Sequence, residues 1–192
     1  MNKVTMGPQT LLYPMPTMLV GANVEGKPNF MVAAWCGIAN SEPPMLSVAI
    51  RPGRHTYRGI RQTMTFSVNV PSTSLVKETD YCGSISGNKI NKAEICRFKV
   101  FYGKLENAPL IEQCPLNLEC KVVHTLELGT HVLIIGRIEE TYVSPDCLTD
   151  GQPDVDKIKP IIYTRSVPQQ YYAFGEVVGK AYSIGQELKP KT

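Results

Sequence analysis

The feature that most constrains the fold is a pair of long segments, residues 116–128 and 131–143, separated only by the dipeptide Gly129–Thr130. Both segments are rich in β-branched residues, which is typical of strands, and a short link that contains glycine predicts a β-hairpin between them. Two sets of side chains alternate along the first segment: Leu118, Cys120 and Val122 in one set, Glu119, Lys121 and Val123 in the other. We therefore expect antiparallel pairing here.

Other segments bounded by Gly, Pro or Asn have the same character. We expect strands over residues 17–24 and 29–40, joined by the turn Glu-Gly-Lys-Pro, and over residues 45–50, 65–70, 98–103 and 161–165. Short helices are expected over residues 54–63 and 71–83, the second one capped by Ser72 or Thr73. Residues 144–157 are expected to form a polar loop. Because strands mostly follow strands, the pattern predicts a mainly β, antiparallel fold that closes into a barrel to hide its edges.

Length and composition indicate one domain that comprises residues 1–192. The chain has 192 residues, of which 43% are hydrophobic and 19% charged, enough for one core. Residues from roughly 173 to 192 are expected to form a C-terminal arm. The sequence shows no signal peptide and no membrane-spanning apolar run, so we expect a cytoplasmic protein without membrane contact. Its six cysteines lack CxxC spacing, which favours free thiols over a metal site.

A net charge of +3 with scattered cations argues against nucleic-acid binding. The densest basic cluster consists of Arg51, Arg54, Arg58 and Arg61. It lies at the expected start of a helix, where free backbone N–H groups and the helix dipole favour an anion. Arg51, Arg54 and the Thr56 hydroxyl could hold a phosphate there, and a solvated basic helix face explains the same residues equally well.

Small residues surround Trp35, the single tryptophan, in the segment Met31–Asn40. Such residues let a planar ring lie against the backbone, although close packing of a second subunit would require them too. A second small-residue segment, Asp80–Lys92, is polar and rich in glycine and is expected to be a loop. No Ser-centred elbow, dinucleotide-binding glycine motif or Walker loop occurs, and no catalytic side chain is predicted.

Taken together, three segments resemble the flavin reductase-like family, whose members have an FMN-binding split barrel. The segments are NFMVAAWCGIANSEPPMLSVAIRPGRHTYRGIRQTMTFSVNVPS, TDYCGSISGNKINK and GTHVLIIGRI. The resemblance runs from about Tyr13 to Thr164 and is nearest to the flavoredoxin-like branch. It implies a six-stranded antiparallel Greek-key split barrel with a few short flanking helices, assembled as a homodimer that holds FMN non-covalently near the subunit interface.

The resemblance also implies which positions hold the cofactor. The flavin ring and ribityl chain would lie along Asn29, Met31, Val32, Ala33, Ala34 and Trp35, mainly against backbone groups. The phosphate would meet Arg51, Arg54, His55 and Thr56. Asn69 would lie beside the flavin, and Cys82, Gly83, Ser86, Gly87 and Lys92 would belong to a loop over it. The chain departs from the family pattern at Val32, where threonine is frequent, and at Asn88 and Asn91, where charged residues are more usual.

The implied activity is NAD(P)H-dependent electron transfer through bound FMN, of the flavin reductase type. Two alternatives stay open: a flavoredoxin-like electron carrier with a protein donor, and an FMN-binding protein without a redox partner. The flavin supplies the redox chemistry in each case, which agrees with the lack of acid–base catalysts in the sequence.

Overall fold

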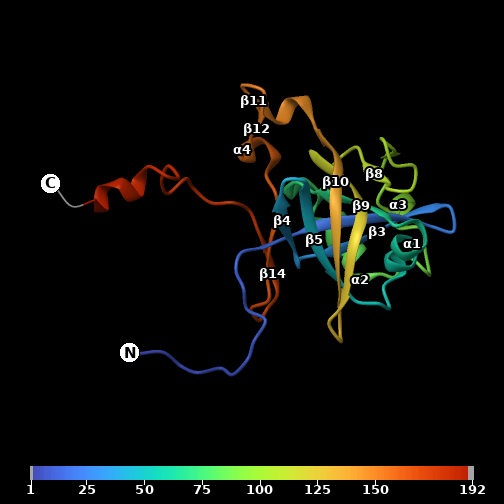
Figure 1. Cartoon of the computed structure of the whole chain (residues 1–192), viewed down its shortest axis with the longest axis horizontal. Coiled ribbons are helices and arrows are strands. Elements are labelled where there is room, and N and C mark those ends of the chain that lie inside the picture. Colours follow the sequence, from blue (N-terminus) through green and yellow to red (C-terminus); the bar gives the residue numbers. More distant parts are fainter. Residues whose placement is uncertain (1, 190–192) are drawn as a thin grey trace.

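The computed structural model describes residues 2–189 and has a curved, seven-stranded antiparallel sheet at its centre (Figure 1). The strand order is β3 (Lys27–Ala33), β2 (Met18–Val24), β6 (Thr65–Val70), β9 (Leu116–Glu127), β10 (Val132–Val143), β5 (Pro44–Ile50) and β4 (Cys36–Ser41). The prediction of a mainly β, antiparallel fold with short helices is confirmed.

The sheet closes on itself around one apolar core. Met31 and Ala33 of β3 share this core with Leu46 and Val48 of β5, although the two strands are far apart in the strand order. The backbone oxygen of Trp35 accepts a hydrogen bond of 2.9 Å from the Ala49 amide, which joins the end of β3 to β5. The seventh strand, β4, is exposed on the outer edge, and it is the addition to the six strands that the resemblance implied.

The expected strand over residues 29–40 is wrong, because the chain bends at Ala34 and Trp35 and divides it into β3 and β4. The preceding turn is also shorter than expected. Only Glu25 and Gly26 turn, with φ of 52° and 76°, and both φ values lie in the left-handed region that two-residue hairpin turns require. Lys27 and Pro28 already belong to β3.

The long hairpin β9–β10 is confirmed. The pairing slips between Ile135 and Gly136 and again between Ile138 and Glu140, so the hairpin contains two irregularities that increase its bend. Cys120 and Val122 point into the barrel core, as the alternation indicated.

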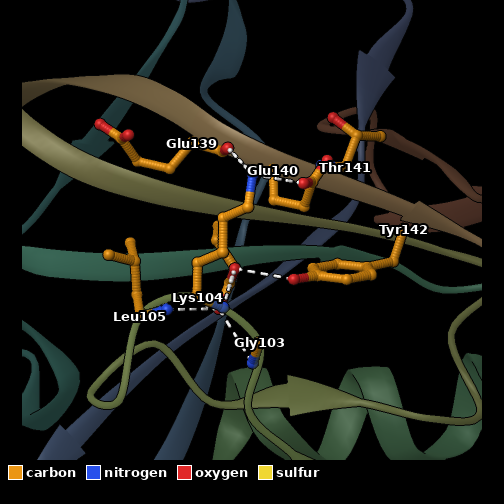
Figure 2. Close-up of polar contacts among 8 residues, drawn as sticks. Gly103, Lys104, Leu105, Glu139, Glu140, Thr141 and Tyr142 are labelled. Atoms are coloured by element: carbon orange, nitrogen blue, oxygen red, sulfur yellow. Dashed lines mark hydrogen bonds and ion pairs between the residues drawn. The ribbon is translucent and has the colours of Figure 1, made fainter.

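Glu119 lies on the opposite face of β9 and is fully buried, because the loop Gly103–Leu105 covers it. Its Oε1 accepts hydrogen bonds of 3.1 Å each from the backbone amides of Gly103 and Leu105. Its Oε2 accepts one of 2.9 Å from the Lys104 amide and one of 3.1 Å from the Tyr142 hydroxyl. Figure 2 shows these residues converging from the loop and from β10. A carboxylate bonded in this way fixes the loop on the barrel wall.

The helices flank the barrel. Their bounds are α1 His55–Thr63, α2 Val76–Ser84, α3 Lys92–Ile95 and α4 Val155–Ile158, with short 3₁₀ turns at Thr73–Leu75, Pro145–Cys147 and Ile184–Leu188. The expected caps of α2 are wrong, because α2 begins only at Val76, after a 3₁₀ turn that contains Thr73, and its N-cap residue is Leu75. Ser72 precedes the 3₁₀ turn and makes no side-chain cap bond. The Ser72 hydroxyl bonds the Ser74 hydroxyl instead, at 2.6 Å.

Short strands form three small sheets outside the barrel. They are β1 (Met15–Pro16) with β13 (Ile162–Thr164) and β14 (Gln170–Tyr172); β7 (Val100–Phe101) with β8 (Leu110–Ile111); and β11 (Leu148–Thr149) with β12 (Gln152–Pro153). The polar loop expected over residues 144–157 is therefore wrong, because it contains a small hairpin and most of α4. None of the helices among residues 2–189 combines the length and hydropathy that a membrane span requires.

The two ends of the chain leave the barrel on the same side (Figure 1). Residues 173–189 extend away from the body with every side chain exposed. Large apolar side chains lie along both extensions, among them Val4, Leu12, Phe174, Val178, Tyr182 and Leu188. The expected arm thus has an extended shape, and its last residues, 190–192, lie outside the described part of the chain.

Candidate functional site

The predicted site residues on β3 divide between the two faces of the strand. Met31 and Ala33 point inward and are each 6% exposed, so only their backbone faces the outside. Val32 points outward against α2, where a Cβ built on Gly83 would lie 3.4 Å from the Val32 Cβ. That distance is an ordinary van der Waals contact, so α2 lies against β3 at this position. Val32 and Gly83 therefore belong to one wall.

A cavity of about 380 Å³ opens beside this wall. We call it the β3–α2 cavity. It brings together four predicted site residues, Val32, Ala34, Arg54 and Gly83. It is also lined by five residues that the sequence did not predict: Asp80, Ser84, Tyr163, Gln169 and Tyr171. Tyr163 and Tyr171 come from β13 and β14, and Gln169 comes from the connection between these two strands.

A second cavity, of about 360 Å³, shares the lining residue Ala34 with the β3–α2 cavity. We call it the Trp35 cavity. Its lining is mostly apolar: Leu12, Pro14, Met15, Pro16, Ala34, Trp35 and Cys36, with Thr10. The Trp35 ring lies against the ring of His131, with 4.5 Å between centroids. Burial and the nearby Arg51 guanidinium lower the pKa of His131, which favours a neutral imidazole beside the tryptophan.

A third cavity, of about 290 Å³, lies between the β2–β3 turn and the loop of residues 87–91. Asn29, His55 and Gly87 line it, together with the polar side chains of Asn88 and Asn91. A Cβ on Gly87 would lie 1.8 Å from the Asn29 Oδ1, so only glycine allows the loop this close to β3. The predicted residues thus divide between separate cavities rather than sharing one.

The beginning of α1 supplies exposed cations. Arg51 and Arg54 are exposed, and Arg54 precedes the helix in an extended conformation without a side-chain cap. His55 is half-buried, and its pKa is lowered by burial and by the charge of Arg58. The helix N-terminus and the Arg54 side chain together favour an anion at this end of the β3–α2 cavity.

The side chains of Thr56 and Asn69 are buried and bonded within the protein, unlike side chains that are free to bind a ligand. Thr56 is 1% exposed, and its Oγ1 accepts a 2.6 Å hydrogen bond from the Asn29 side chain. Asn69 is fully buried; its amide donates to the Leu19 oxygen and the Ser67 hydroxyl, and its Oδ1 accepts from the Ile111 amide and from Asn117. Both side chains bond to the protein itself, so they position strands and helix.

Lys92 and Cys82 hold the segment Asp80–Lys92 together. Lys92 is 3% exposed, and its Nζ donates to the backbone oxygens of Cys82 and Ile85, at 2.9 Å and 3.1 Å. These are carbonyls at the C-terminal end of α2, which a cation stabilises. Burial, followed by the Arg54 charge, lowers the pKa of Lys92. Burial raises the pKa of the Cys82 thiol to about 12, so this thiol is unreactive at neutral pH.

The glycine-rich segment is therefore only partly a loop. Residues up to Ser84 belong to α2, and a tight turn follows, in which the Ser86 hydroxyl accepts a hydrogen bond from the Asn88 amide at 3.3 Å. Asn91 caps α3, because its Oδ1 accepts from the Glu94 amide at 3.3 Å. The asparagine at position 91 thus performs a capping role that needs no charge.

Comparison with known proteins identifies the family. Residues 10–171 match the model of the family described as flavin reductase like domain. The chain belongs to this family. Flavoredoxin from Methanosarcina acetivorans is 41% identical to this chain, with a TM-score of 0.93 over 98% of this chain and 100% of that structure. Flavoredoxin of Desulfovibrio vulgaris (Miyazaki F) is 37% identical, with a TM-score of 0.89 over 95% and 99%. An uncharacterized protein from Archaeoglobus fulgidus is 38% identical over 145 residues, which are 76% of this chain and 81% of the relative.

Membership in this family confirms the split-barrel fold and supports flavin binding. The sequence predicted the strand that contains β13, but it did not predict that Tyr163, Gln169 and Tyr171 line the cavity, because a strand that returns from beyond the barrel leaves no local signal of what it covers. A weak signal existed in the adjacent aromatic residues Tyr171 and Tyr172, which follow Gln169 and Gln170.

Proposed function

We propose that this protein is an FMN-binding flavoprotein that transfers electrons and holds FMN non-covalently in the β3–α2 cavity. The observation that carries the proposal is an apolar wall that lies in the same cavity as an exposed cation. Val32 and Ala34 provide the wall, and Arg54 lines the same cavity at the start of α1. FMN requires these two features, since it joins a planar ring to a phosphate.

The protein groups would act by binding and orientation. Val32 and Gly83 would limit one side of the ring, and Arg54 with the free amides at the start of α1 would hold the phosphate. Bound FMN supplies the redox chemistry, which the side chains of this chain do not provide. The Lys92 contacts keep the C-terminal end of α2, and therefore Gly83, in place.

The resemblance to flavoredoxins favours an electron carrier, and a specific feature keeps NAD(P)H-dependent reduction as a second candidate. The Trp35 cavity shares Ala34 with the β3–α2 cavity, is mostly apolar and measures about 360 Å³. A nicotinamide ring placed there would lie next to the flavin. The donor for the carrier would be a redox protein, and for the reductase NADH or NADPH.

Anaerobic titration distinguishes the two candidates. FMN-loaded protein is mixed separately with NADH, NADPH and a reduced iron–sulfur protein of the ferredoxin class, and the loss of flavin absorbance is followed. Bleaching by the iron–sulfur protein alone supports the carrier, and bleaching by a nicotinamide nucleotide supports the reductase. Protein that does not bind FMN at micromolar concentrations would refute the whole proposal.

We also propose a homodimer. The two chain ends leave the barrel on one side and expose large apolar side chains along their length (Figure 1). Such surfaces usually meet a partner. Analytical ultracentrifugation of the full chain and of a chain ending at residue 173 tests this: a dimer that becomes a monomer on truncation supports it, and a monomeric full chain contradicts it.

A further inference from the structure

The wall of the β3–α2 cavity that faces β3 comes from a lightly attached hairpin. Strands β13 and β14 have three residues each and pair with one another, and β13 also pairs with the two-residue strand β1. The connection between β13 and β14, residues 165–169, is exposed. A hairpin with so few backbone bonds opens at low free-energy cost.

One side-chain contact ties this hairpin to α2. The Tyr171 hydroxyl donates a hydrogen bond of 3.0 Å to the Asp80 Oδ1. Among residues 2–189 it is the one side-chain hydrogen bond between β13–β14 and α2. The hairpin's other outward side-chain bond joins Arg165 to Thr10, which belongs to the exposed N-terminal extension.

Both members of this contact line the β3–α2 cavity, and they approach it from opposite elements. Asp80 comes from α2 and Tyr171 from β14, and Tyr163 supports the Tyr171 ring with 5.8 Å between centroids. Burial and the Asp80 carboxylate raise the pKa of Tyr171, so its hydroxyl stays protonated and remains a donor at neutral pH.

We propose that Asp80 and Tyr171 form a latch over the β3–α2 cavity, so that a flavin enters and leaves when their hydrogen bond opens and the β13–β14 hairpin swings away. This proposal rests on the proposed function for the identity of the ligand, and it adds two residues and a motion that control access. The latch predicts that bound flavin exchanges slowly and that its dissociation rate depends on the hydroxyl group of Tyr171.

The variant Tyr171→Phe removes the hydroxyl and keeps the ring against Tyr163. A hydrogen bond to a charged acceptor changes an open–closed equilibrium about tenfold, so the dissociation rate of FMN should rise about tenfold. The double variant Asp80→Asn with Tyr171→Phe should be no faster than Tyr171→Phe alone, because the same bond is already absent. The matched control is Tyr172→Phe, since the Tyr172 hydroxyl bonds only Gln170 of its own strand, at 2.7 Å.

Two measurements on the full chain test the latch. The first is the dissociation rate of FMN, followed by the recovery of free-flavin fluorescence after dilution. The second is amide hydrogen exchange of residues 162–172 in flavin-free protein, which should be about tenfold faster in Tyr171→Phe and unchanged in Tyr172→Phe. Exchange that is the same in Tyr171→Phe and wild type would overturn the latch even if FMN binds. If the wild type binds no FMN, both the proposed function and the role of the latch in flavin access fail. The hydrogen-exchange measurement still decides whether the Asp80–Tyr171 bond holds the β13–β14 hairpin.

Discussion

Replacing Glu119 with glutamine should destabilise the protein without changing its cavities. The glutamine amide has the shape of the carboxylate, but it carries one acceptor oxygen and an NH₂ group. Four donors meet the carboxylate: the amides of Gly103 and Leu105 at Oε1, and the Lys104 amide with the Tyr142 hydroxyl at Oε2 (Figure 2).

The magnitude follows from these four bonds. The best orientation places the glutamine oxygen at Oε1 and its NH₂ group at Oε2, where the Tyr142 hydroxyl can rotate to accept. The Lys104 amide then faces another donor and stays buried without a partner, which costs about 1–3 kcal/mol. The two bonds at Oε1 lose the charge of their acceptor, at about 1 kcal/mol each. The sum is about 3–5 kcal/mol, a large part of the ~5–15 kcal/mol that stabilises a typical domain.

Urea denaturation, followed by tryptophan fluorescence and circular dichroism, measures the difference in the free energy of unfolding. The control is Glu112→Gln, because Glu112 is exposed and its ion pair with Lys99 spans 3.8 Å; it should change the free energy of unfolding by less than about 0.5 kcal/mol. Tyr142→Phe removes a single bond and should fall between the two. A Glu119→Gln variant within about 1 kcal/mol of wild type would show that the four bonds do not hold the loop as argued.

Three further predictions concern the site and the thiols. Arg54→Ala should weaken FMN binding about tenfold and leave riboflavin binding unchanged, because riboflavin lacks the phosphate; equal losses for both ligands in fluorescence titrations would place the phosphate elsewhere. Cys82→Ser should keep both FMN binding and electron transfer, because the Cys82 thiol is 1% exposed and its pKa is raised to about 12; loss of electron transfer with FMN still bound would give the sulfur a redox role. The free energy of unfolding should fall as the pH rises above about 9, because buried Cys120 stays protonated in the folded state while the thiol of the unfolded chain ionises. The variant Cys120→Ala should make this decline shallower by up to about 1.4 kcal/mol per pH unit. An unchanged slope in urea titrations from about pH 8 to 10 would contradict this role of Cys120.

Most of the barrel could be predicted from local patterns. The β9–β10 hairpin follows from β-branched runs around a glycine turn, and α1 follows from the apolar spacing after Arg54. The bend at Ala34 and Trp35 could not be predicted in this way, because it depends on the Ala49 amide that bonds the Trp35 oxygen from a distant strand. Small residues fit a continuous strand and a bend equally well.

The site was predicted as a list of residues, whereas their arrangement depends on partners remote in the sequence. Lys92 was predicted as a cofactor-binding residue, and its Nζ donates to the backbone oxygens of Cys82 and Ile85. Thr56 was predicted to hold the phosphate, and its hydroxyl accepts a hydrogen bond from the Asn29 side chain. Both side chains form hydrogen bonds with polar groups that are buried in the folded protein. Which groups become buried is decided only when the chain folds.

The β3–α2 cavity joins Val32, Arg54, Gly83 and Tyr171, which come from four separate parts of the chain. A partly folded chain cannot contain it, because its walls meet only after the barrel has closed and the last strand has returned. A ligand held there has little to recognise in the folding transition state. Bound flavin should therefore leave the refolding rate nearly unchanged and act on the lifetime of the folded protein, by slowing its unfolding.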